Sequence, residues 1–144
     1  MAELVADLRA AAPAWEPLLI GAIARDLLLY HAHNITVRRA TEDIDIAFAV
    51  ADWEEFSRLR GALLVSTHFK AHNSMTHRFF HRQHRQIDVV PFGGLELPDG
   101  TIAWPPRGDE VMKVVGFRDA LASAMDAMLP KGQRVLVVSL SMLV

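Results

Sequence analysis

The chain has 144 residues, of which 51% are hydrophobic and 22% charged, as expected for one globular domain with a substantial core. Its net charge of −2 with neutral histidines gives no overall positive field for nucleic acid, and the absence of cysteine excludes disulfides and thiolate metal sites. The apolar stretches are too short to span a membrane and the N-terminus lacks the pattern of a signal peptide, so we expect a cytoplasmic protein without membrane contact.

The first third of the chain changes from a helical to an extended pattern and back. Apolar residues recur at helical spacing over 2–12, and Pro13 ends that run. A short apolar strand over 17–20 follows, then a turn at Gly21 and a helix over about 23–33. The change of period at the glycine predicts a strand–turn–helix unit.

The middle of the chain predicts further strands around one helix. A strand over 42–50 precedes an amphipathic helix over 51–64. Residues 66–75 are expected to form a loop or an irregular edge. Two strands then occupy 76–94, with a polar turn near residues 83–84.

The last third is less regular. The Asp99-Gly100 pair predicts a hairpin within 97–104, and a loop follows over 105–110. A strand is predicted over 134–140. The segment 116–129 fits either a helix or the first arm of a hairpin, and its pattern does not decide between them. The whole pattern is that of a single mixed α+β domain.

Acidic residues stand inside two apolar strands. The segment TEDIDIAF (41–48) carries Asp43 and Asp45, which lie on one face of a strand because side chains alternate. Asp88 stands in the later strand QIDVVPF. Three acids on neighbouring strands would destabilise a sheet unless a positive group lies among them. Carboxylate oxygens favour Mg²⁺ or Mn²⁺.

The turn at Gly21 adds a phosphate-binding element. A helix N-terminus offers unpaired N–H groups to phosphate oxygens, and a glycine lets the backbone approach them closely. Taken singly, a glycine turn or a solvated Asp-x-Asp has an ordinary structural explanation. The ordered set favours a site where two metal ions assist an in-line displacement at phosphorus.

The same residues carry a resemblance to a known superfamily. The chain resembles the DNA polymerase β-like nucleotidyltransferases, in which a strand, a Gly-Gly or Gly-Ser turn and a helix precede an Asp-x-Asp/Glu strand and a third acid. Here these are Gly21-Ala22, Asp43-Ile-Asp45 and Asp88. The chain looks most similar to the AbiEii/MenT-like toxin nucleotidyltransferases, whose R-x-T/S-x-D-h-D motif matches residues 39–45.

The resemblance implies a fold and a role for each residue. The fold would be a mixed, twisted sheet flanked by helices. Asp43 and Asp45 would hold both metal ions and the phosphates of an NTP, and Asp88 would complete one metal site and help to deprotonate the acceptor. Gly21 and Ala22 would cradle the phosphates, although Ala22 lacks the hydroxyl found in Gly-Ser turns.

Three further residues are candidates near this site, and the two arginines have two explanations each. Arg25 would reach a phosphate or form a surface ion pair, and Arg39 would contact the triphosphate or order the Asp-x-Asp loop. Thr41 is expected to serve mainly as a turn residue.

The implied function is transfer of NMP from an NTP to an RNA such as tRNA, or to a protein hydroxyl, within a toxin–antitoxin system. The partners would then be an NTP, an RNA and a cognate antitoxin or toxin protein. One alternative is a minimal nucleotidyltransferase antitoxin that modifies a toxin. Another is a truncated, inactive domain that binds NTP or a partner, which is expected if the family's C-terminal helical domain is absent or truncated here, and Ala22 also departs from the motif. The apolar end VLVVSLSMLV suggests a homodimer or partner contact.

Two histidine-rich features lie outside this predicted site. The run HRFFHRQHRQ (77–86) fits a polar hairpin better than a nucleic-acid surface, since half of its positive charge depends on histidine protonation. His31 and His33 lack a third clustered ligand for zinc.

Overall fold

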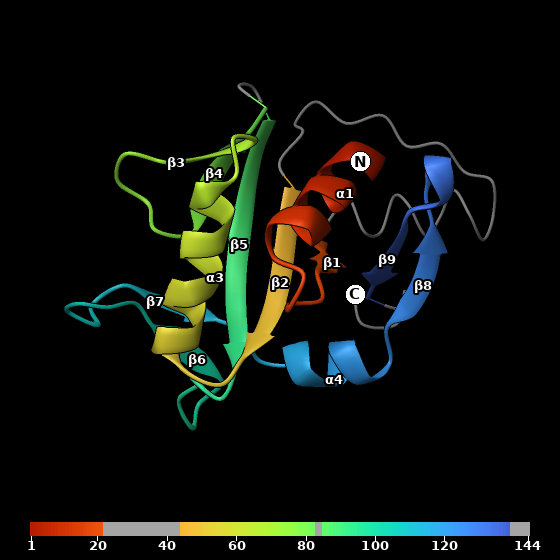
Figure 1. The fold of residues 1–144 in the computed structure, drawn as a ribbon. Coiled ribbons are helices and arrows are strands. Elements are labelled where there is room, and N and C mark those ends of the chain that lie inside the picture. Colours follow the sequence, from red (N-terminus) through yellow and green to blue (C-terminus); the bar gives the residue numbers. More distant parts are fainter. Residues whose placement is uncertain (22–43, 83–84, 139–144) are drawn as a thin grey trace.

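The computed structural model describes residues 1–21, 44–82 and 85–138 (Figure 1). Within them, seven strands form one mixed sheet in the order β3-β4-β5-β2-β1-β9-β8, and β6 and β7 form a small second sheet. The strands are β1 (Leu18–Ile20), β2 (Ile44–Val50), β3 (Phe69–Ala71), β4 (Arg78–His81), β5 (Arg85–Gly93), β6 (Thr101–Ala103), β7 (Val111–Lys113), β8 (Met125–Met128) and β9 (Arg134–Val137). The helices are α1 (Ala2–Ala11), α3 (Trp53–Val65), α4 (Phe117–Ala122) and the 3₁₀ helix η1 (Pro130–Gly132).

The core lies between the large sheet and two helices that cover one of its faces, α1 and α3 (Figure 1). Each helix buries one apolar stripe against the sheet: Leu4, Val5 and Leu8 in α1, and Phe56, Leu59 and Leu63 in α3. Because the apolar residues recur at helical spacing, burying them leaves most of the polar residues of each helix toward solvent, and Asp7 of α1 is an exception.

Strand β2 has the alternation predicted from its sequence. Ile44, Ile46 and Phe48 are buried on one face, whereas Asp45 on the opposite face is only half-buried. The strand is central in the sheet, between β1 and β5. A carboxylate is therefore held in the middle of the sheet by two neighbouring strands.

Helix α3 begins at an N-cap that its sequence supplies. The backbone N–H of Glu55 donates to Oδ1 of Asp52 at 2.8 Å, and Oε1 of Glu55 accepts from the backbone N–H of Ala51 at 2.7 Å. These two bonds satisfy N–H groups that have no partner inside the helix. The helix predicted over 51–64 is confirmed, with its start at Trp53.

The hairpin predicted within 97–104 is wrong in its pairing. The tight turn forms, because the N–H of Gly100 donates to the carbonyl of Leu97 and the N–H of Leu97 to that of Thr101. The strand after it, β6, pairs with β7 on the far side of the loop 104–110 instead of with the preceding segment. The segment before the turn makes only turn bonds to the segment after it, and the strand hydrogen bonds of β6 are made to β7.

Two segments that the sequence pattern left undecided each contain a strand at an edge of the large sheet. The segment 66–75 contains the short edge strand β3. The segment 116–129 contains both of the elements considered for it, first α4 and then β8, which pairs antiparallel with β9.

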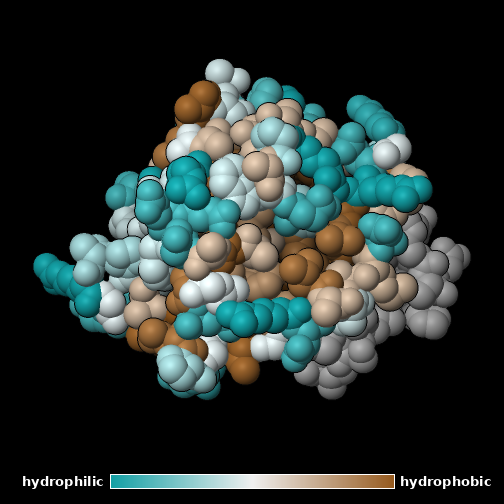
Figure 2. All heavy atoms as spheres, turned by 60° about the horizontal axis from the view of Figure 1, so that its bottom comes forward, coloured by the Kyte–Doolittle hydropathy of each residue, from teal (hydrophilic) through white to brown (hydrophobic). Residues whose placement is uncertain are grey.

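The end of the molecule that carries α4 exposes apolar surface. Figure 2 shows hydrophobic side chains near the centre of this face, with hydrophilic residues around them. Helix α4 packs near the carboxyl end of β5, where the rings of Phe92 and Phe117 meet edge to face at 5.8 Å between centroids. Asp45 lies near the other end of β2 and Asp88 is paired with it, so the apolar face is separate from these two acids. No helix among the described residues is long and apolar enough to cross a membrane.

Candidate active site

Two of the predicted acids lie side by side in the centre of the sheet. Strands β2 and β5 are parallel, and their register pairs Asp45 directly with Asp88. Paired residues on neighbouring strands project from the same face, about 4.8 Å apart along the sheet. The Asp88 side chain is 19% exposed. The two carboxylates therefore form one acidic site that solvent reaches only in part.

Gly21 borders this pair. Strand β1 runs antiparallel to β2 and pairs Ile20 with Asp45, so the next residue, Gly21, follows directly at the acidic site. Its φ is +72°, a conformation that L side chains rarely adopt. A Cβ atom at this position would lie 2.7 Å from Oδ2 of Asp45. Both the backbone angle and the close approach require glycine here.

Arg78 is a site residue that the sequence analysis missed. It lies opposite Asp88 in the antiparallel pair of β4 and β5. Its Nε donates to Oδ1 of Asp88 at 2.8 Å, and its Nη2 to Oδ2 at 3.2 Å. The predicted turn near residues 83–84 would bring Arg78 to within one position of Asp88. It pointed to the neighbourhood of the two residues but did not fix the register that pairs them. Arg78 is thus a positive group beside the acids, of the kind expected where acids stand on neighbouring strands.

The remaining site predictions lie outside the described residues; they are Ala22, Arg25, Arg39, Thr41 and Asp43. Within the described ranges, no group of three His, Cys, Asp or Glu side chains is placed to hold a metal ion. Asp45 and Asp88 supply two of the three predicted ligands. Their oxygen-only donor set fits Mg²⁺ or Mn²⁺, and Gly21 brings the backbone close to Asp45. His31 and His33 also fall outside the description.

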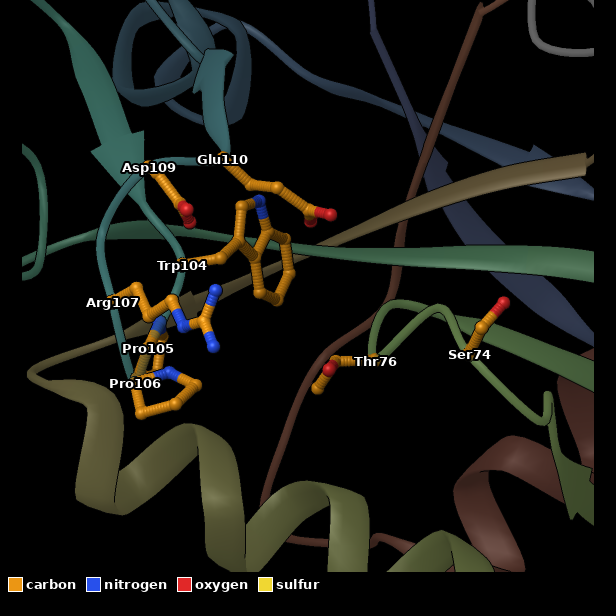
Figure 3. Close-up of a pocket in the computed structure, with 8 residues that line it drawn as sticks. All are labelled: Ser74, Thr76, Trp104, Pro105, Pro106, Arg107, Asp109 and Glu110. Atoms are coloured by element: carbon orange, nitrogen blue, oxygen red, sulfur yellow. The ribbon is translucent and has the colours of Figure 1, made fainter.

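A separate cavity of about 200 Å³ lies beside the loop that joins β6 to β7 (Figure 3). Its walls are Ser74, Thr76, Trp104, Pro105, Pro106, Arg107, Asp109 and Glu110. Of the predicted site residues that the structure describes, Gly21, Asp45 and Asp88, none lines it. Trp104 is 5% exposed, and its ring packs on Trp53 at 5.0 Å and on Phe56 at 5.6 Å between centroids. The indole thus serves mainly to attach this loop to α3.

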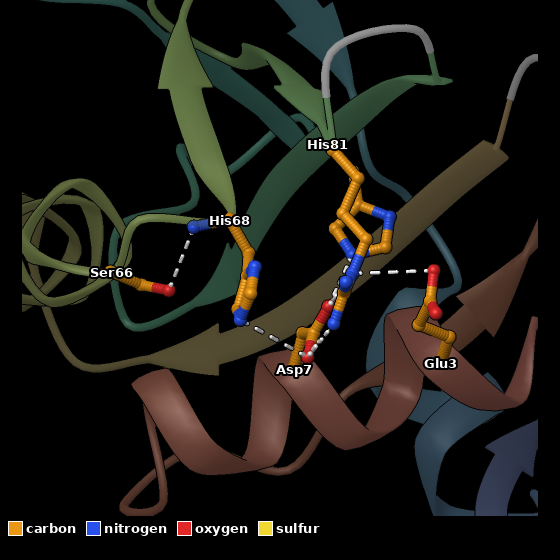
Figure 4. A network of polar contacts seen from close by, with 6 residues as sticks. Glu3, Asp7, Ser66, His68 and His81 are labelled. Carbon is orange, nitrogen blue, oxygen red and sulfur yellow. Dashed lines mark hydrogen bonds and ion pairs between the residues drawn. The ribbon is translucent and has the colours of Figure 1, made fainter.

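The histidine- and arginine-rich hairpin is tied to α1 by Asp7 (Figure 4). The His81 ring lies with Nε2 2.6 Å from Oδ2 of Asp7, and Nε of Arg82 donates to the same oxygen at 2.8 Å. His68 lies 4.0 Å from the other oxygen. His81 and Arg82 thus have an intramolecular carboxylate partner, which favours the polar hairpin over a nucleic-acid surface.

The pKa values of this network shift for identifiable reasons. Burial lowers the pKa of His81, which is 2% exposed, against the opposing effect of Asp7. Burial alone would raise the pKa of Asp7, but hydrogen bonds from Arg82 and His81 outweigh it and hold that pKa below its usual value. At neutral pH the network is therefore a carboxylate, a neutral imidazole and a guanidinium.

Comparison with known proteins identifies the fold. No protein-family model and no curated protein matches the chain. Among solved structures, the chain is similar to ANT(2")-Ia in complex with adenylyl-2"-tobramycin, with a TM-score of 0.53 and 18% identity over 99% of this chain and 71% of that one. ANT(2")-Ia is an aminoglycoside nucleotidyltransferase. The predicted mixed α+β fold is confirmed: this chain has the nucleotidyltransferase fold.

Proposed function

We propose that this chain transfers a nucleoside monophosphate from an NTP to an acceptor hydroxyl, in a reaction that requires divalent cations. One observation carries the proposal: in a nucleotidyltransferase fold, Asp45 and Asp88 are paired in register beside a glycine that leaves no room for a side chain. Two carboxylates side by side in a sheet repel each other, and a bound cation would relieve that repulsion together with Arg78, which pairs with Asp88.

The metal site would be made by three carboxylates. Asp45 and Asp88 supply two of them, and Asp43, one residue before β2, would supply the third. Bound Mg²⁺ or Mn²⁺ would neutralise the charge that develops on the phosphate oxygens.

The phosphates would lie against the turn at the end of β1. Gly21 and Ala22 would present backbone N–H groups to them, as at other helix N-termini that bind anions. Arg25 and Arg39 are further candidates for phosphate contacts, and Thr41 for ordering the turn before Asp43. The protein contributes mainly positioning and a preorganised field, as is general for transfers at phosphorus.

The transfer is an in-line displacement. The acceptor oxygen forms a bond to the α-phosphorus, the bond from that phosphorus to the oxygen bridging to the β-phosphate breaks, and pyrophosphate leaves. The proton of the acceptor hydroxyl passes to a carboxylate oxygen of Asp88, the third acid of the site.

The candidate functions differ in the molecule that accepts the nucleoside monophosphate. The resemblance in residues 39–45 favours an RNA such as tRNA or a protein hydroxyl, within a toxin–antitoxin pair, with an antitoxin that modifies its toxin as the alternative. A different candidate comes from the structural neighbour, which is bound to an adenylylated tobramycin. That observation favours a small hydroxylated molecule as acceptor. A domain that binds NTP without turnover is the remaining alternative.

The test is a transfer assay with separate acceptor classes. The protein is incubated with each α-labelled NTP and Mg²⁺ or Mn²⁺, together with total RNA, with protein extract or with tobramycin. Asp45→Asn and Asp88→Asn are the site variants, and Asp126→Asn on the exposed strand β8 is the matched control. Label in one acceptor class that is lost in both site variants and kept in the control supports the proposal and names the acceptor. NTP binding without transfer to any class would favour the binding domain.

A further inference from the structure

We propose that Arg78 is a positioning residue that competes with a divalent cation for Asp88. This inference rests on the proposed metal site. It assigns to Arg78 two effects: the guanidinium holds the Asp88 carboxylate in place before metal binds, and it lowers the affinity of the site for a bare metal ion.

The geometry of the pair is that of a strong, planar ion pair. Both carboxylate oxygens of Asp88 accept hydrogen bonds, one from Nε and one from Nη2 of Arg78. Such two-point pairing fixes the carboxylate plane as well as its position. The side chains are 24% and 19% exposed, so solvent screens their attraction less than at an open surface.

The cross-strand register makes the contact unavoidable. Arg78 and Asp88 are directly paired between β4 and β5, and Asp88 is directly paired with Asp45 between β5 and β2. The three residues therefore form one row across three adjacent strands, with a positive charge at one end of two negative charges. Side chains that face each other across strands are close enough to interact directly.

The competition follows from charge. A metal ion at the Asp45–Asp88 pair would use an oxygen that already accepts from Arg78, at about 2.1 Å for Mg²⁺. A carboxylate has enough lone pairs for both groups, but the guanidinium and the cation repel each other across it. Metal binding therefore has to weaken the Arg78–Asp88 pair or displace the guanidinium.

The experiment measures Mn²⁺ binding to the whole chain, without nucleotide, by calorimetry and by the electron paramagnetic resonance signal of unbound Mn²⁺. Arg78→Met removes the charge and keeps the length of the side chain, and Arg78→Lys keeps the charge but loses the two-point pairing. Arg58→Met is the matched control, because Arg58 pairs with the exposed Glu54 on α3 at 3.7 Å and its loss changes the net charge equally. Asp88→Asn and the double variant Arg78→Met/Asp88→Asn complete the set.

We expect Mn²⁺ to bind Arg78→Met about tenfold more tightly than the wild type, because the repulsion is gone. Arg78→Lys should fall between the two, and Arg58→Met should match the wild type. In the Asp88→Asn background, Arg78→Met should give no gain, since the effect acts through Asp88.

The results separate this inference from the function on which it rests. If the wild type binds Mn²⁺ and Arg78→Met binds it equally or more weakly, the competition is refuted and the metal site stands. A gain of the same size in the Asp88→Asn background would also refute it. If neither the wild type nor Arg78→Met binds Mn²⁺, both the inference and the proposed metal site are wrong.

Discussion

Asp45 on β2 is paired directly with Asp88 on β5, and both carboxylates project from one face of the sheet. If they hold a metal ion, Mg²⁺ or Mn²⁺ stabilises the folded state by mass action, by about 2.7 kcal/mol at a hundredfold excess over Kd. We predict that Asp45→Asn loses this metal-dependent rise in Tm. Without metal, the same variant should melt at or above the wild-type temperature, because the repulsion between the carboxylates is relieved.

The control for this prediction is Asp126→Asn, which changes an exposed aspartate on the edge strand β8. It should keep the full response to metal. An undiminished response in Asp45→Asn would mean that the cation binds elsewhere.

Replacing Gly21 tests the close approach at the end of β1. Gly21→Ala forces a side chain into a left-handed backbone conformation and brings Cβ against Oδ2 of Asp45. We expect a loss of about 1–2 kcal/mol in the free energy of unfolding from the backbone conformation alone, measured by urea denaturation. We also expect the metal response to fall, since Asp45 has to move. A variant with wild-type stability and metal response would contradict the geometry of this turn.

Replacing Gly61 should have the opposite effect on the free energy of unfolding. It lies inside α3, and a Cβ there would meet no atom within 4 Å. Gly61→Ala should therefore raise the free energy of unfolding by about 0.5–1 kcal/mol, because alanine loses less conformational freedom in a helix. Urea denaturation of both variants, Gly61→Ala and Gly21→Ala, measures this change. A decrease in the free energy of unfolding would contradict the open space that the structure shows around this position of α3.

The buried imidazole of His81 predicts a loss of stability in acid. Its pKa is lowered by burial from 6.5, so the folded state prefers the neutral ring. The stability it contributes is present above pH 6.5 and declines as the pH falls toward the lowered pKa. The pKa of Asp7 is held below 3.8, so its contribution is lost only in stronger acid.

The measurement is the free energy of unfolding between about pH 7.5 and about pH 5.5, one unit either side of the reference His pKa. His81→Gln should remove part of the decline seen in the wild type. An identical pH dependence in the wild type and His81→Gln would exclude His81 as its source.

Local pattern was enough to predict several elements. The alternation of Asp45 with Ile44 and Ile46 predicted the face that carries the acid, and the stripe of α3 predicted a half-buried helix. Gly21 was predicted at the turn after β1, where it has a positive φ. In these cases the information lies within a few neighbouring residues.

Pairing between distant segments could not be predicted in the same way. Nothing local in β6 indicates that β7 is its partner, and β3 has three residues, too few to show a period of two. The segment before η1 is rich in alanine and methionine, which favour helix, but pairing with β9 makes β8 a strand. The contact of Asp45 with β5 was expected only from the family resemblance.

Arg78 shows the same limit at the site. Its charge and its place in a strand were visible in the sequence, but the contact with Asp88 depends on the register of β4 on β5. A shift of one residue would turn Arg78 to the other face. The predicted turn near residues 83–84 was one position from the correct register, which was not close enough to assign the ion pair.

The most direct test of the account compares two labelled forms of the same NTP. In the presence of Mg²⁺ or Mn²⁺ and the accepting class, label from the α-phosphate should appear in the acceptor, and label from the γ-phosphate should appear in pyrophosphate. Both signals should fall by about 10²-fold or more in Asp45→Asn and Asp88→Asn, as expected when groups that stabilise transition-state charge are removed. Transfer of the γ-label to the acceptor, or equal α-label transfer by the site variants, would contradict nucleotidyl transfer at this pair of carboxylates.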